Sequence, residues 1–169
     1  MSSVLNSEQL TPPITYEDWL NCFDLLRVSS SVDNSVVMTI ARGTFISRGY
    51  IVVKFQQKLA ETINEMLNRR IGRFLKDLNL LISFNELSDI VPLFVKLRNE
   101  INKCLFFTGF GFLDINVKRE LEESVITQME KFWDDTIVFL KKQTLDFYNA
   151  DLEDSLFLIQ RIKLFTKTI

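Results

Sequence analysis

Apolar side chains recur every three or four residues through the middle of the chain. A repeat of this kind places one apolar stripe along a helix and is close to the seven-residue repeat of coiled coils. A β-strand would instead alternate apolar and polar residues. The sequence therefore predicts a long helix that packs against other helices. The positions that carry the repeat are Leu59, Ile63, Leu67, Ile71, Phe74, Leu78 and Leu81.

Few residues that interrupt helices accompany this repeat. The 169 residues include only five glycines and three prolines, and Pro12 and Pro13 lie near the N-terminus. Sheet folds of this size need more turns than these residues can mark. We therefore expect an all-α fold, an elongated antiparallel bundle of four to five helices that dimerisation could complete. Residues 1–13 should form a flexible tail and residues 14–169 a single helical-bundle domain.

The longest helix is expected over about residues 36–84, where it would extend roughly 70 Å at about 1.5 Å per residue. Its first part is ambiguous, because residues 36–53 are rich in β-branched side chains and contain Gly43 and Gly49. Such a composition also suits a β-hairpin. However, the segment lacks a clean alternation and has no two-residue turn such as Asn-Gly. Helix is therefore favoured, with a hairpin as the alternative.

Four further helices are expected around this one. Thr15 followed by Asp18 matches a capping box, in which each residue satisfies a free amide of the other, so the first helix should begin there. The helix that follows the long one should have Pro92 in its first turn, where proline is tolerated, and should end near residue 107. The remaining two should begin near residues 114 and 151.

Charge and composition exclude several functions. The formal net charge of −2 argues against a dedicated nucleic-acid-binding protein, which usually carries a large positive excess. The absence of histidine excludes Ser-His-Asp and Cys-His catalysis and His-ligated zinc or haem. We expect no cofactor. The two cysteines should be buried free thiols, and no secretory signal or membrane-spanning stretch is visible, so a cytoplasmic protein is expected.

Basic residues cluster near the middle of the long repeat. Residues 36–83 hold eight Lys or Arg against three Asp or Glu. Such a patch could bind phosphates or an acidic partner. The alternative is a solvated face, or pairing with the acidic helix expected over residues 114–148. The cluster comprises Arg69, Arg70, Arg73 and Lys76.

Acidic residues gather on the later helices, and clustered carboxylates can bind Mg²⁺. The pair Asp151-x-x-Asp154, followed by SLFLIQRI, resembles the E-x-x-D element of all-α nucleotide pyrophosphohydrolases of the MazG type. Their E-E-x-x-E element has no counterpart, because the Glu-Glu pair at 122–123 is followed by Ser, Val and Ile. The resemblance implies Mg²⁺-dependent nucleotide hydrolysis, and the alternative is that both aspartates are helix caps. The other acidic residues are Glu120, Glu130, Asp134 and Asp135.

The most apolar segment is CLFFTGFGFL at residues 104–113. Exposed rings in this turn could insert into a membrane surface or into a groove on a partner. The alternative is that the rings close the end of the core, with Gly109 and Gly111 allowing the backbone to turn. Trp133 is a further candidate contact, because Trp is common at interface hot spots. The four rings belong to Phe106, Phe107, Phe110 and Phe112.

No catalytic, cofactor or metal site is predicted. The favoured function is a non-enzymatic helical interaction, adaptor or regulatory protein that binds a protein partner or itself, and a homo-oligomer is expected. One alternative is a Mg²⁺-dependent nucleotide hydrolase that uses helix carboxylates. The other is a peripheral membrane-binding protein that uses the Phe-rich turn. The partner-binding candidates are Arg69, Arg70, Arg73, Lys76, Phe110, Phe112 and Trp133.

Overall fold

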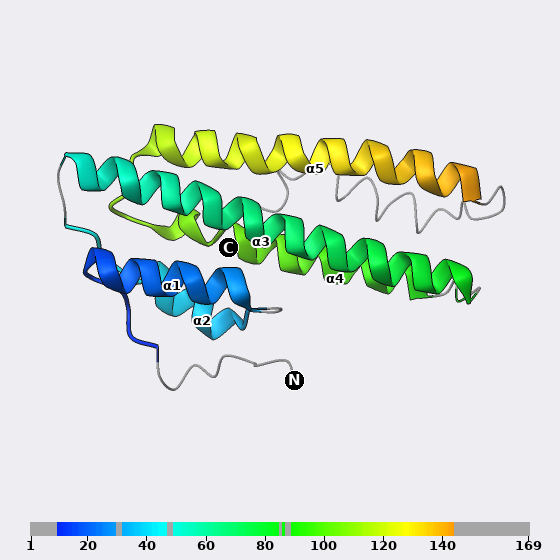
Figure 1. Ribbon diagram of the computed structural model, residues 1–169, viewed down its shortest axis with the longest axis horizontal. Coiled ribbons are helices and arrows are strands. Elements are labelled where there is room, and N and C mark those ends of the chain that lie inside the picture. The colour runs from blue at the N-terminus through cyan, green and yellow to red at the C-terminus, as the bar shows by residue number, and fades with distance from the viewer. Residues whose placement is uncertain (1–9, 30–31, 47–48, 85, 87–88, 144–169) are drawn as a thin grey trace. The chain divides into compact units, whose positions relative to one another are not determined.

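The computed structural model describes residues 10–29, 32–46, 49–84, 86 and 89–143, and its helices are labelled in Figure 1. Within these residues the chain forms helices and connecting segments and no strand. The predicted all-α fold of helices packed against one another is confirmed. The last expected helix, with Asp151 and Asp154, lies outside the described residues.

The described residues divide into two compact units. The first unit is drawn from residues 1–69 and 103–122, and the second from residues 70–102 and 123–169. The expected organisation into a tail over residues 1–13 and one domain over residues 14–169 stays a prediction.

Helix α1 of the first unit, Tyr16–Val28, begins at the predicted capping box. The Thr15 hydroxyl accepts a hydrogen bond from the Asp18 amide at 3.2 Å, and the Asp18 carboxylate accepts one from the Thr15 amide at 2.9 Å. At the other end, Arg27 donates two hydrogen bonds to the Glu65 carboxylate on α3, at 2.7 and 3.0 Å. The buried face of α1 carries Trp19, Cys22, Phe23 and Leu26.

The core of the first unit is built around the indole of Trp19, which has no exposed surface. Its ring centre lies 5.3 Å from that of Phe55 on α3 and 5.0 Å from that of Phe110 in the Phe-rich turn. Aromatic rings prefer such edge-to-face arrangements at these separations. Its indole N–H donates to the Thr44 carbonyl at 2.8 Å, so the one polar atom of the ring is satisfied in the interior.

The predicted unbroken helix over residues 36–84 is wrong at its start. Helix α2 covers Asn34–Ala41, the segment 42–49 is not helical where it is described, and α3 covers Tyr50–Ser83. A side chain on Gly43 would lie 2.7 Å from both Pro13 and Trp19, so this chain segment packs closer than any other residue allows. Gly49 has a φ of 70°, which no helix accommodates. The two glycines thus separate α2 from α3.

Helix α3 is the long helix that the apolar repeat predicted. Its 34 residues correspond to about 51 Å at about 1.5 Å per residue. All of the repeat positions in the first unit are buried. In the second unit, Ile71 and Leu81 are half-buried. The fully buried positions of the repeat are Leu59, Ile63, Leu67, Phe74 and Leu78.

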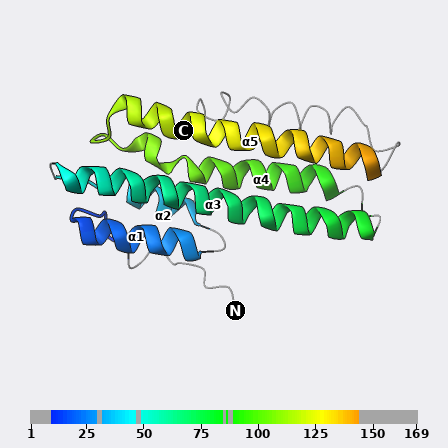
Figure 2. The ribbon, with the colours of Figure 1, turned by 45° about the horizontal axis from the view of Figure 1, so that its top comes forward.

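The second unit packs the C-terminal half of α3 against parts of α4, Ile90–Cys104, and α5, Ile115–Gln143. Within this unit successive helices run in opposite directions, as Figures 1 and 2 show. Phe74 joins all three, because its ring centre lies 4.7 Å from that of Phe94 on α4 and 5.6 Å from that of Phe132 on α5. Arg70 on α3 forms an ion pair with Glu100 on α4 at 3.5 Å.

Candidate functional site

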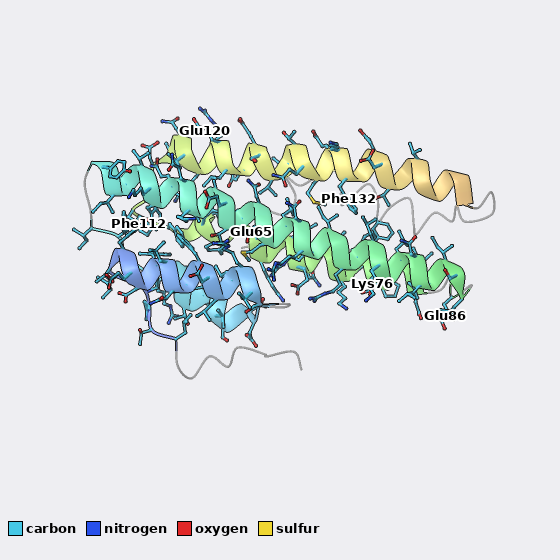
Figure 3. All side chains as sticks on the ribbon, in the orientation of Figure 1. Glu65, Lys76, Glu86, Phe112, Glu120 and Phe132 are labelled. Carbon is cyan, nitrogen blue, oxygen red and sulfur yellow. The ribbon has the colours of Figure 1, made fainter. Side chains whose placement is uncertain are left out.

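One member of the predicted basic cluster does not lie on the surface. Arg70 is only 4% exposed and belongs to the interior, where it pairs with Glu100. Arg69 is exposed in the first unit and donates to the Val28 carbonyl at 3.3 Å. Arg73 and Lys76 are exposed on α3 in the second unit, and Lys76 is labelled in Figure 3.

The Phe-rich turn forms part of the core of the first unit. After α4 ends at Cys104, the short 3₁₀ helix η3, Phe106–Gly109, packs against α2. Phe106, Phe107 and Phe110 are all buried, and Phe112 is half-buried against Trp19 and Phe55. The alternative that these rings close the core is what the structure shows. Membrane insertion through them would require the unit to open.

The remaining predicted contacts gain no geometric support. Trp133 lies in α5, but its side chain falls outside the described part of the chain. Within the described residues, no three Cys, Asp or Glu side chains come together as a metal ion would require. Asp151 and Asp154, on which the resemblance to nucleotide hydrolases depends, are outside those residues as well.

A different surface of the second unit is hollowed. Where α3 ends and α4 begins, a shallow open groove of about 570 Å³ lies between them. Phe84 stands 70% exposed and Leu80 47% exposed beside it, on successive turns of the same helical face. Most of the lining surface is apolar. The lining residues are Asp77, Leu80, Leu81, Phe84, Glu86, Asp89, Pro92, Leu93 and Lys96.

Backbone hydrogen bonds define the end of α3 beside the groove. The last turn of α3 is closed by the bond from the Phe84 amide to the Leu80 carbonyl at 3.0 Å. The chain then folds back, because the Glu86 amide donates to the Leu81 carbonyl at 2.9 Å. Helix α4 begins at Ile90, with Pro92 in its first turn as predicted. The end of α3 and the start of α4 thus both contribute apolar side chains to the groove.

The charges around the groove are mainly negative. Three carboxylates, from Asp77, Glu86 and Asp89, line it, against the single ammonium group of Lys96. None of the four takes part in an ion pair within the described residues. Figure 3 labels Glu86 in the turn that follows α3. These three carboxylates are called the acidic rim, and their combination with an apolar lining favours a ligand that has both apolar and basic groups.

Sequence reasoning missed this groove, although one signal was present. The segment 78–84, LNLLISF, carries apolar residues at five of seven positions, which is wider than a single helical stripe. Some of these side chains must face away from the core that the repeat defines. The position of α4 decides which ones, and that depends on tertiary packing.

Comparisons with known proteins give no relative for this chain. No family model matches it, and no curated protein or solved structure is significantly similar. Among the helices within the described residues, none combines the length and the apolar character needed to cross a bilayer.

Proposed function

We propose that the chain is a non-enzymatic interaction module whose α3–α4 groove binds a segment of a protein partner. The observation that carries this proposal is the exposure of Phe84 and Leu80 over a preformed groove. Large apolar side chains of this kind are the usual anchors of protein interfaces when a partner removes them from water.

The acidic rim defines the chemistry of the partner segment. An amphipathic helix laid into an apolar groove contacts it through anchors three, four or seven residues apart. Lys or Arg beside these anchors would meet Asp77, Glu86 and Asp89. Complementary charge of this kind speeds association and fixes the orientation of the bound segment.

Fluorescence anisotropy with a synthetic peptide tests the groove. The probe is an amphipathic peptide with Leu anchors at helical spacing and Lys flanks, and a second peptide has Glu in place of Lys. We expect the Lys peptide to bind and Phe84→Ser to raise its Kd about tenfold or more, which corresponds to about 1.4 kcal/mol. We expect the Glu peptide to bind more weakly.

Val138→Ser is the matched control, because Val138 is 51% exposed in the same unit but does not line the groove. Circular dichroism should show unchanged helix content in both variants. An equal Kd for wild type and Phe84→Ser would show that the groove is not the binding site.

A further inference from the structure

The first unit carries a second apolar surface, where the chain enters α3. Ile46 is 88% exposed, Tyr50 71%, Val53 50% and Ile51 42%. With Lys54, these residues are called the apex below. Tyr50 and Val53 are three residues apart and share a helical face, and Ile51 lies beside them. Four large apolar side chains within eight residues thus face solvent.

The packing beneath the apex explains why these side chains point outward. Phe45, which precedes Ile46, stacks on Phe55 with ring centres 4.4 Å apart. Phe55 in turn is buried against Trp19 and Phe23. Aromatic side chains from both ends of this segment therefore fill the core, while the apex residues stay exposed.

The charged residue of the apex, Lys54, is basic, and the sequence around it is basic as well. From Asn34 to Ala60 the sequence holds four basic residues and no acidic one. The Lys54 ammonium group lies 4.5 Å from the centre of the Tyr50 ring, in a cation–π contact. Arg42, at the end of α2, is exposed as well. The apex therefore combines large apolar side chains with basic groups.

The α3–α4 groove offers the opposite chemistry, because its floor is apolar and its carboxylates outnumber its single ammonium group. We propose that the apex of one copy of this chain docks in the groove of a second copy. This inference rests on the proposed function of the groove and names the partner as the chain itself. Ile46 and Tyr50 supply the anchors, and Lys54 faces the acidic rim.

A contact between two different surfaces is heterologous, so a pair of copies still presents one free groove, on the copy whose apex is docked, and one free apex, on the other copy. Copies would therefore join head to tail. Contact between two apices is disfavoured, because it would bring the basic groups of both copies together.

Sedimentation velocity over a range of concentrations tests this arrangement with two complementary variants. Phe84→Ser removes the groove anchor and leaves the apex, whereas Ile46→Ser combined with Tyr50→Ser removes the apex and leaves the groove. We expect the wild type to associate increasingly with concentration and each variant alone to remain at 19.8 kDa. An equal mixture of the two variants should form dimers and nothing larger, because one intact apex then meets one intact groove.

Met38→Ser and Val138→Ser are the controls, since both residues are exposed and lie outside the two surfaces. They should associate as the wild type does. High salt should weaken association, because the charged groups are exposed and screened.

Three outcomes would overturn the proposal. These are a wild type that stays at the mass of one chain at every concentration, a mixture that fails to associate, and an apex variant that associates as well as the wild type. If a monomeric wild type instead binds phosphatidylserine-containing vesicles through Ile46 and Tyr50, the apex is a lipid-binding surface. If the Lys peptide still binds the groove in any of these cases, the proposed function stands and only self-association fails.

Discussion

Gly43 and Gly72 illustrate how differently two glycines act in one chain. Gly43 lies against Pro13 and Trp19, where an added methyl group would approach to 2.7 Å. Gly72 lies exposed within α3, with nothing near the position of a Cβ atom. The same substitution should therefore have opposite effects at the two positions.

We expect Gly43→Ala to lower the free energy of unfolding by about 1–3 kcal/mol, because it overpacks the interior. Gly72→Ala should raise it by about 1 kcal/mol, because Ala is the better helix former. Urea denaturation followed by circular dichroism measures both. A loss of stability for Gly72→Ala would contradict the helix-propensity account, and a gain for Gly43→Ala would contradict the packing account.

Asp18 makes the start of α1 sensitive to acid. Hydrogen bonds from the backbone and the hydroxyl of Thr15, and from the Ile14 amide, hold the pKa of this carboxyl below its ordinary value of 3.8. The folded state therefore favours the charged form. The stabilisation is fully present above the pKa of the unfolded chain and is lost as the pH falls through the lower pKa of the folded chain.

We expect the stability of Asp18→Asn to depend less on pH in the acidic range than that of the wild type. The measurement is the urea midpoint of wild type and variant between neutral pH and pH values below 3.8. The difference between the two proteins should shrink as the pH falls. A difference that stays constant would mean that the ionisation of Asp18 does not contribute to the pH dependence of stability.

Between elements, the ion pair of Arg70 and Glu100 joins α3 to α4 inside the second unit. Its side chains are 3% and 17% exposed, so the pair is largely removed from water. Deleting one partner leaves a buried charge without its counter-charge, which usually costs more than the pair contributes. We expect Glu100→Ala to lower the free energy of unfolding by about 3 kcal/mol.

The exposed pair of Lys58 and Glu61 provides the comparison. Glu61→Ala should change the free energy of unfolding by less than about 0.5 kcal/mol, because solvent screens such pairs. The double variant Arg70→Met with Glu100→Leu should recover much of the loss caused by Glu100→Ala. A double variant no more stable than Glu100→Ala would count against this account of the buried pair.

The helices themselves could largely be predicted from the sequence, because their periodicity and caps are local. Thr15 and Asp18 cap α1, and the apolar repeat marks α3, as expected. The break between α2 and α3 could not be predicted with confidence. It depends on the close contact of Gly43 with Pro13 and Trp19, which lie far away in sequence.

The candidate site was harder to predict for the same reason. Helical spacing shows which residues share a face but not which face another helix covers. Arg70 and Phe110 look available for partners in the sequence and are buried. Phe84 belongs to no predicted stripe and is exposed, because α4 begins beyond it.

At the scale of the whole chain, both cysteines lie in the first unit, so their reactivity measures the opening of that unit. Cys22 is 4% exposed and Cys104 fully buried. Burial, together with the charge of Asp18, raises the pKa of the Cys22 thiol from 9.0 to about 11. The reactive thiolate is thus scarce in the folded state.

We expect neither thiol to react with Ellman's reagent in the folded protein, and both to react once the first unit unfolds. A raised thiol pKa also means that stability should decline as the pH rises above about 9. There the Cys22 thiol loses its proton in the unfolded chain but keeps it in the folded one. Cys22→Ala should remove that decline. Rapid labelling of either thiol in native buffer would show that the first unit opens readily.

The segment that leads into the apex is held by hydrogen bonds on both sides. The Thr44 amide donates to the Pro13 carbonyl at 2.9 Å, and the Thr44 carbonyl accepts from the Trp19 indole at 2.8 Å. Phe45 is held on Phe55. The backbone entering Ile46 is thus preorganised, so the proposed docking there would cost little conformational entropy, and a modest contact area would be enough for a measurable affinity.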